Sequence, residues 1–213
     1  MKQYTLILAL SGILSLSAYA TAHNTVPLPP KQISAVAGHY SSTYGYVHVK
    51  PAQGSVFTNF NGRRITVVKK SDGFYYSTLK LIGTIPITLR MSLAKVNGLQ
   101  RVSLNKRTSK KVVAQQFKAT PISSEWMSRL GEYRARAING HSKITSVKFE
   151  TQNGVVLIRL NSSKYAYPLI IKKGNRLVRP TIGRARQRHI EVWPRRDSLA
   201  AIIGNVRFVL EKR

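Results

Sequence analysis

The sequence predicts an all-β fold, an antiparallel β-barrel of about 8–10 strands with little helix, from three observations. Short strand-like runs follow one another and are separated by glycine turns. Asn-Gly dipeptides, the strongest short hairpin signal, stand between pairs of such runs. Landmarks in the first half of the chain recur in the second half at a nearly constant offset.

The offset lies between 91 and 93 residues and indicates a duplicated unit. Its clearest landmark is the Gly-x-Tyr motif, which occurs as Gly38 and Tyr40 and again as Gly131 and Tyr133. The other matches are Asn61-Gly62 with Asn153-Gly154, Gly83 with Gly174, and Phe117 with Phe208.

Two half-units, residues 33–119 and 126–213, are expected to close on each other as a single barrel domain, residues 33–213. The reasons are that a half-unit alone is too small to bury an adequate core and that closure removes exposed strand edges. Residues 1–22 read as a secretory signal peptide, and the proline-rich residues 23–32 read as an extended leader.

The signal peptide is indicated by Lys2, by the apolar residues 6–16, and by the small-x-small sites Ala18-Tyr19-Ala20 and Ala20-Thr21-Ala22. It predicts an exported protein, periplasmic or secreted. No later apolar run is long enough for a transmembrane helix once the signal is removed. The chain has no cysteine, so disulfides, thiolate metal sites and lipid attachment through cysteine are excluded.

The first half-unit carries predicted strands at residues 44–50, 55–60, 64–69, 74–79, 85–93, 99–104 and 112–117. Asn61-Gly62, Asp72-Gly73 and Asn97-Gly98 are its expected turns, and Pro86 marks an edge or a strand start.

Residues 119–125 join the half-units, and Ser123 or Ser124 there is expected to cap a short helical turn that leads into the second half-unit. Its expected turns are Asn153-Gly154 and Gly174-Asn175. Its predicted strands are residues 144–149, 155–160, 165–171, 176–178, 190–193, 199–203 and 206–210.

The chain has 35 Lys and Arg against 7 Asp and Glu, which predicts attraction to polyanions or to a charged surface. The candidates are lipopolysaccharide, acidic polysaccharide and anionic lipid, with nucleic acid the least favoured because the protein is expected to be exported. The alternative is that the charge is only a general property of a basic exported protein. The candidate anion-binding residues are Arg63, Arg64, Lys106, Arg107, Lys110, Lys111, Arg184, Arg186, Arg188, Arg195 and Arg196.

A family resemblance rests on Leu130-Gly131-Glu132-Tyr133, on Asn153-Gly154 and on Tyr165-Ala166-Tyr167-Pro168-Leu169. These residues resemble the lipocalin-like domain that follows the catalytic domain in β-lactamase-related serine hydrolases. The catalytic domain has no counterpart here. The resemblance therefore implies a small antiparallel, lipocalin-like barrel, and it carries over no catalytic residue.

Enzymatic chemistry finds little support in the residues. Ser77 and Lys80 match Ser-x-x-Lys, but that pair acts on a helix and here falls in a strand-like run, so we interpret the match as fortuitous. The five histidines lack metal-ligand spacing, and the acids form no close pair. We therefore expect a protein that is not an enzyme and has no cofactor or metal.

The tyrosines have two interpretations: they line a ligand cavity at the barrel mouth, or they fill the barrel core. The first leads to the main hypothesis, an exported, strongly basic, non-catalytic barrel that binds a small or amphipathic ligand. The alternative hypothesis is a polyanion-binding or surface-associated protein that acts through its Arg and Lys clusters. The candidate ligand-binding residues are Tyr40, Tyr44, Tyr46, Tyr75, Tyr76, Tyr133, Tyr165 and Tyr167.

Overall fold

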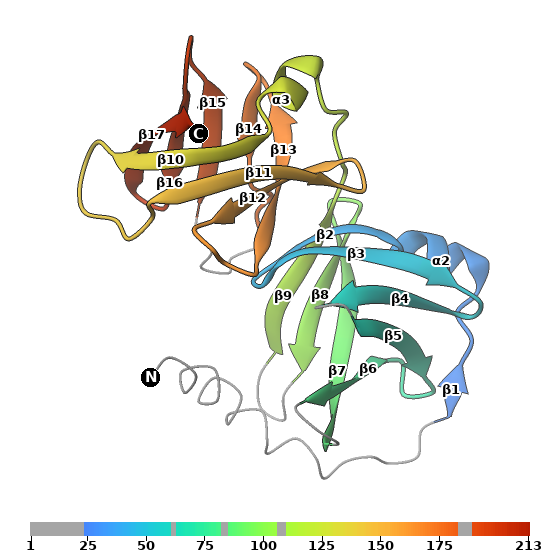
Figure 1. The fold of residues 1–213 in the computed structure, drawn as a ribbon. Helices are drawn as coiled ribbons and strands as arrows, with labels where there is room; N and C mark the ends of the chain where they lie inside the picture. The colour runs from blue at the N-terminus through green and yellow to red at the C-terminus, as the bar shows by residue number, and fades with distance from the viewer. Residues whose placement is uncertain (1–23, 61–62, 82–84, 106–109, 183–188) are drawn as a thin grey trace.

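A computed structural model describes residues 24–213 apart from 61–62, 82–84, 106–109 and 183–188. The fold is all-β, with two eight-stranded antiparallel barrels that lie side by side (Figure 1). The helices of the described residues are two short ones, α2 (Pro30–Val36) and α3 (Ser124–Ser128). The predicted all-β antiparallel architecture with little helix is confirmed. The predicted signal peptide lies outside the described residues.

Barrel 1 consists of β2 to β9, and the pairing of β5 with β6 closes it. A further short strand, β1 (Thr25–Val26), pairs with the end of β5. The strands are β2 (Gly38–Ser42), β3 (Gly45–Ala52), β4 (Ser55–Phe60), β5 (Arg63–Lys70), β6 (Tyr75–Leu81), β7 (Ile85–Val96), β8 (Leu99–Asn105) and β9 (Lys110–Phe117).

Barrel 2 consists of β10 to β17, and the pairing of β10 with β17 closes it. The strands are β10 (Gly131–Ala137), β11 (Ser146–Gln152), β12 (Val155–Leu160), β13 (Ala166–Lys172), β14 (Arg176–Val178), β15 (Ile190–Pro194), β16 (Leu199–Ile203) and β17 (Val206–Lys212). Both barrels follow a simple meander, in which every strand pairs with its neighbours in the chain.

The structure therefore has two barrels, and the expectation that both half-units form a single barrel is wrong. Each repeat contains eight strands and closes its own barrel, which leaves no open edge to be shared. The argument from core size failed because each barrel also buries apolar side chains against a short helix and against the other barrel.

The proline-rich segment, expected to be an extended leader up to residue 32, is instead part of barrel 1. Leu28 is buried in the barrel 1 core, and α2 starts at Pro30, a position that suits proline because its missing N–H is not needed there. The backbone N–H of Leu28 also donates to Gly54 O at 2.8 Å.

The Gly-x-Tyr motif has the same structural role in both barrels. Gly38 and Gly131 have φ values of +131° and +128°, in the left-handed region that favours glycine. Two residues later, the Tyr40 hydroxyl donates to Val36 O and the Tyr133 hydroxyl donates to Arg129 O, both at 2.7 Å. Each tyrosine thus ties the first strand of its barrel to the end of the preceding helix.

The other residues matched by the constant offset do not occupy equivalent positions in the two barrels. Asn153-Gly154 joins β11 to β12, and the equivalent hairpin of barrel 1 is closed by residues 53–54. Asn61-Gly62 and Gly83 lie outside the described residues. Phe117 pairs with His39, whereas Phe208 pairs with Ala137, four positions after Tyr133. The duplication is real in strand order, and Gly-x-Tyr is its sequence marker.

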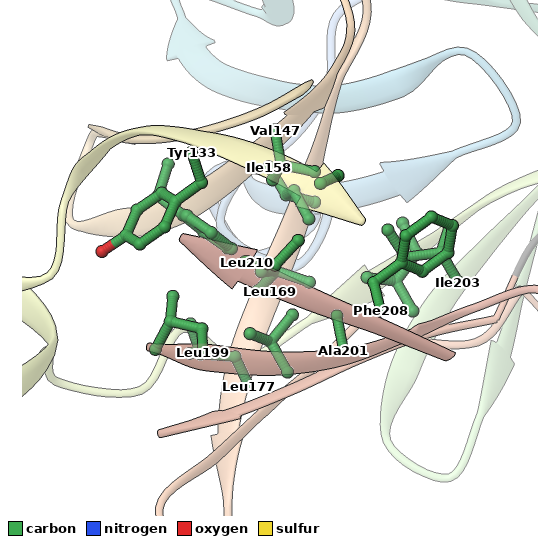
Figure 2. Close-up of a cluster of buried hydrophobic side chains, with 14 of the residues drawn as sticks. Tyr133, Val147, Ile158, Leu169, Leu177, Leu199, Ala201, Ile203, Phe208 and Leu210 are labelled. Atoms are coloured by element: carbon green, nitrogen blue, oxygen red, sulfur yellow. The ribbon is translucent and has the colours of Figure 1, made fainter. Parts of the chain in front are cut away.

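The main core fills the interior of barrel 2 (Figure 2). Alternate residues of its strands point inward, among them Tyr133, Phe149, Leu177, Phe208 and Leu210. The indole of Trp126, on α3, is buried at the same cluster, and its Nε1 donates to Asn175 O at 3.2 Å. The helix therefore covers the barrel end that carries the β13–β14 turn.

Candidate functional site

The outer face of β12 is buried against barrel 1. Val155 and Leu157 alternate with the core residues Val156 and Ile158, so they point away from the interior of barrel 2. They are nevertheless only 2% and 1% exposed, because they pack with Phe117 of β9 in an apolar cluster between the barrels. This contact brings two sets of side chains from distant parts of the sequence together.

The two backbones meet at Gly45, the first residue of β3. A Cβ at this position would lie 2.5 Å from the carbonyl oxygen of Ala166 on β13, and Gly45 also has φ of +106°. A polar bond on the linker supports the same contact, since Thr120 Oγ1 accepts from the backbone N–H of Ile171 at 2.9 Å. Only glycine fits this close approach without displacing the strands.

An arginine of barrel 2 also crosses to barrel 1. Arg179 is 4% exposed, its Nη2 donates to Ser42 O at 2.9 Å, and its guanidinium lies 4.2 Å from the ring centre of Tyr167. Beside it, Ser41 Oγ donates to Pro180 O at 3.2 Å. A buried guanidinium is costly unless it is hydrogen-bonded, and here its contact joins the two barrels.

A groove with a volume of about 310 Å³ opens along one side of this contact. Both barrels contribute aromatic, amide and basic side chains to it. Its lining residues are Tyr44, Tyr46, His48, Lys50, Asn59, Gln152, Asn153, Leu157, Arg159, Lys164, Tyr165 and Ala166. The exposed lining is mainly polar, with tyrosine rings among the amide and basic side chains.

The barrel 1 wall carries a connected set of rings. His39 and His48 are cross-strand partners on β2 and β3, and their imidazoles stack with centroids 4.7 Å apart. His39 Nδ1 is 2.8 Å from the Tyr46 hydroxyl. Asn153, from the barrel 2 turn, lies close enough to Tyr46 and His48 to influence the pKa of both. The Asn-Gly turn therefore borders the groove wall of the other barrel.

The rings of this wall are neutral at neutral pH. Burial lowers the pKa of His39. Burial also lowers the pKa of His48, with further lowering from His39 and Lys50, and the nearby Asn153 side chain opposes this. Burial raises the pKa of Tyr46. The positive charge of the groove therefore comes from its lysines and arginine.

Arg159 has a positioning role in the groove. Its Nη2 contacts Glu150 Oε1 at 2.5 Å, and its Nη1 donates to the carbonyls of Ser163 and Lys164 at 3.3 and 3.0 Å. These bonds hold the loop that presents Lys164 and Tyr165. Among the described residues, neither Lys50 nor Lys164 of the groove lining forms an ion pair, and Lys164 Nζ lies 5.3 Å from the ring centroid of Tyr165.

Three of the eight tyrosines selected from the sequence meet in this groove. Tyr44 and Tyr165 face each other across it with ring centroids 6.2 Å apart, and Tyr46 lies beside them. Sequence reasoning placed them at a barrel mouth, whereas they lie on the outside of both barrels. The prediction that these three tyrosines bind a ligand stays a prediction.

The other five tyrosines lie elsewhere. Tyr40 and Tyr133 are buried and hold the helices, and burial raises the pKa of each phenol. Tyr167 packs against the barrel 2 core. Tyr76, on the outer face of barrel 1, donates to Asp72. Tyr75 lines a second cavity of about 310 Å³ between α2 and the end of barrel 1.

The candidate anion-binding residues do not form one cluster. Arg64 is exposed on β5, and Lys110 and Lys111 are exposed at the start of β9. Arg195 and Arg196 are exposed in the β15–β16 loop of barrel 2. The side chain of Arg63 and the whole of Lys106, Arg107, Arg184, Arg186 and Arg188 lie outside what the structure describes.

Ser77 is buried within β6, so the Ser-x-x-Lys match lies on a strand and lacks the helix that this arrangement needs. Within the described ranges, no group of three or more His, Asp or Glu side chains is placed to hold a metal ion. In the same ranges, no helix combines the length and apolar character needed to cross a membrane.

Several groove and contact residues were missed in the sequence, chiefly Arg159, Lys164 and Arg179. Nothing local distinguishes them from the many other cations. A usable signal was the unbroken apolar run Val155–Ile158, since a strand buried on one face alternates and an unbroken run indicates burial on both faces.

A comparison of the chain with family models, curated proteins and solved structures found no match. The resemblance to the lipocalin-like domain therefore stays a prediction, and the function must be argued from the residues of the groove and the surface.

Proposed function

We propose that this chain is an exported, non-catalytic binding protein that takes a small anionic ligand with an apolar or ring-shaped part in the groove between its barrels. Export is supported by the signal-like residues 1–22. The observation that carries the proposal is the convergence of Tyr44, Tyr46 and Tyr165 with the ammonium groups of Lys50 and Lys164.

The chemistry of the lining defines the ligand class. The tyrosine rings offer apolar contact to a ring or a short alkyl chain, and the lysines offer charge to a carboxylate, sulfate or phosphate. Asn59 and Gln152 add amide donors and acceptors. A volume of about 310 Å³ suits a compact amphipathic anion.

The proposal is tested with the fluorescent probe 1-anilinonaphthalene-8-sulfonate, which joins aromatic rings to a sulfonate. We expect one site per folded chain. Lys164→Ala and Tyr165→Ala should each weaken binding about tenfold, because the first removes a charge for the sulfonate and the second removes a ring for the aromatic part. The matched control is Lys172→Ala, which removes an exposed lysine of β13 outside the groove.

Binding that Lys164→Ala and Tyr165→Ala leave unchanged would contradict the groove as the site. A stoichiometry well above one, or binding that follows partial unfolding in circular dichroism, would show that the probe reports exposed core and not a site.

A second candidate function is binding of a polyanion by the basic surface. It is favoured by the uneven charge, since residues 24–119 contain fifteen Lys and Arg and the single acid Asp72. We expect the protein to be retained on immobilised heparin, to elute only when the salt concentration is raised, and not to be retained on an uncharged matrix. Absent retention, or retention that salt does not weaken, would contradict this function.

A further inference from the structure

The outer face of barrel 1 over β4–β7 carries cations that lie on aromatic rings. We call it the cation–aromatic face. Its three pairs, with distances from cation to ring centroid, are Arg64 on Phe57 at 3.9 Å, Arg90 on Phe74 at 3.6 Å and Lys70 on Tyr76 at 4.8 Å.

The strand register places these groups on the outside of the barrel. Val56 and Val67 are partners in the core, so their neighbours Phe57 and Thr66, also partners, point outward. Arg64 and Lys70 lie an even number of residues from Thr66 on the same strand and share its face.

The strand register also places side chains of β6 and β7 on the cation–aromatic face. On β6 and β7, Tyr76 is the partner of Val68 on one side and of Arg90 on the other. The cations therefore extend across adjacent strands, which are spaced about 4.8 Å apart.

The negative charge within reach of this face comes from one residue. Asp72 is the only acid of residues 24–119, and it accepts from Tyr76 and pairs with Arg90 at 3.4 Å. Barrel 2 differs, because five of its six acids form ion pairs with its own cations. Barrel 2 has cation–ring pairs as well, such as Arg176 with Trp193 and Arg179 with Tyr167, but the ring-bound cations of barrel 1 have only Asp72 as an acid of their own barrel.

We propose that the cation–aromatic face binds an acidic polysaccharide. This rests on the second candidate function, polyanion binding, and is independent of the groove. A guanidinium that lies flat on a ring is held in place, while the N–H donors at its edge stay available for carboxylate or sulfate oxygens. The exposed hydroxyls of Thr66, Thr78 and Thr88 on the same face can bond to sugar hydroxyls.

Two other polyanions fit this face less well. Single-stranded nucleic acid stacks its bases on open aromatic faces, but the protein's own cations cover these rings. Lipid surfaces require an apolar anchor beside the cations. The large exposed hydrophobic side chains of the described residues, Val26, Tyr44, Met127 and Ile138, all lie off the β4–β7 face.

The test compares two triple variants that lose the same charge. Arg64→Gln/Lys70→Gln/Arg90→Gln removes the cations of the face, and Lys143→Gln/Lys172→Gln/Lys173→Gln removes three exposed lysines of barrel 2. Affinity for a heparin oligosaccharide is measured by calorimetry at several salt concentrations. We expect the face variant to bind at least about tenfold more weakly and the control to stay within about twofold of the unmodified chain.

A second variant separates the rings from the charges. Phe57→Leu/Phe74→Leu keeps every cation and removes the rings beneath Arg64 and Arg90, so we expect about a threefold loss as the guanidinium groups become less ordered. Circular dichroism of each variant verifies the fold, and if the triple variant unfolds, the single changes Arg64→Gln and Arg90→Gln carry the same test.

Each alternative result overturns a separate statement. Equal losses of heparin affinity in the two triple variants would show that binding depends on net charge alone, and would overturn the cation–aromatic face as the binding site. No heparin binding by the unmodified chain would overturn polyanion binding itself. Tighter binding to a thymidine oligonucleotide or to phosphatidylglycerol vesicles, lost in the face variant, would overturn the polysaccharide as the partner.

Discussion

The two barrels have the same strand order, the same preceding helix and the same tyrosine bond, yet their interiors differ. Barrel 2 is filled by a continuous apolar cluster that includes Phe149, Leu177 and Phe208, all at 2% exposure or less. Among the side chains that the structure describes in barrel 1, the buried apolar cluster is Leu28, Val36 and Val56, together with half-buried neighbours such as Leu93.

Polar atoms also enter the interior of barrel 1. By register, Thr58 and Ser77 lie on the side of the sheet that Val56 and Val67 define as the interior. Among the described residues, these buried hydroxyls have no hydrogen-bond partner, which costs stability. A shared topology therefore does not imply a shared core, and among the described side chains the larger apolar core is that of barrel 2.

The largest expected effect breaks the core of barrel 2. Phe208→Ala should lower the free energy of unfolding by about 3–5 kcal/mol, because it leaves a cavity in a close-packed interior. Leu93→Ala in barrel 1 should cost less than about 2 kcal/mol, because the side chain is already half-exposed. Urea denaturation measures both. A loss at Leu93 equal to that at Phe208 would contradict the difference between the cores.

A smaller effect is expected where the barrels touch. Gly45→Ala places a methyl group against the Ala166 carbonyl and strains a positive φ, so we expect a loss of about 3 kcal/mol. Gly98→Ala is the matched control, because its φ is +78° and its added Cβ meets nothing within 4 Å. It should cost only about 1 kcal/mol.

The readouts for this pair are urea denaturation and the amide chemical shift of Ala166. Equal losses at Gly45 and Gly98 would mean that the close backbone approach contributes nothing to stability.

The smallest effect tests what the barrels share. Tyr40→Phe and Tyr133→Phe each remove one hydroxyl that donates to a helix carbonyl at 2.7 Å. Each should cost about 1 kcal/mol, and the two losses should be alike because the bonds are alike. Thermal unfolding of the two variants gives the comparison. Losses that differ by more than about twofold would show that the surrounding core, not the bond, sets the effect.

The sequence predicted the local elements well. Alternation and turn chemistry located most strands, and Asn97-Gly98 and Asn153-Gly154 form hairpin turns with positive φ at both residues. Gly-x-Tyr marked the start of each repeat. These features are decided by residues close together in the chain, so a pattern can report them.

The number of barrels and the groove could not be read in the same way. Strand patterns do not say which strand closes on which, and a weak repeat match paired the wrong hairpins. Tyr44 and Tyr165, 121 positions apart in the chain, meet because the two barrels pack against each other, with Val155 and Leu157 on Phe117 and Gly45 on Ala166. Such a meeting depends on the packing of whole domains.

The two-sided burial of β12 has a consequence for how the chain folds. Barrel 2 produced alone would expose Val155 and Leu157 as an apolar strip along one strand. Such strips promote self-association until they are covered. In the full chain barrel 1 covers that strip. Cutting the chain at residues 118–123 is therefore expected to increase the self-association of barrel 2.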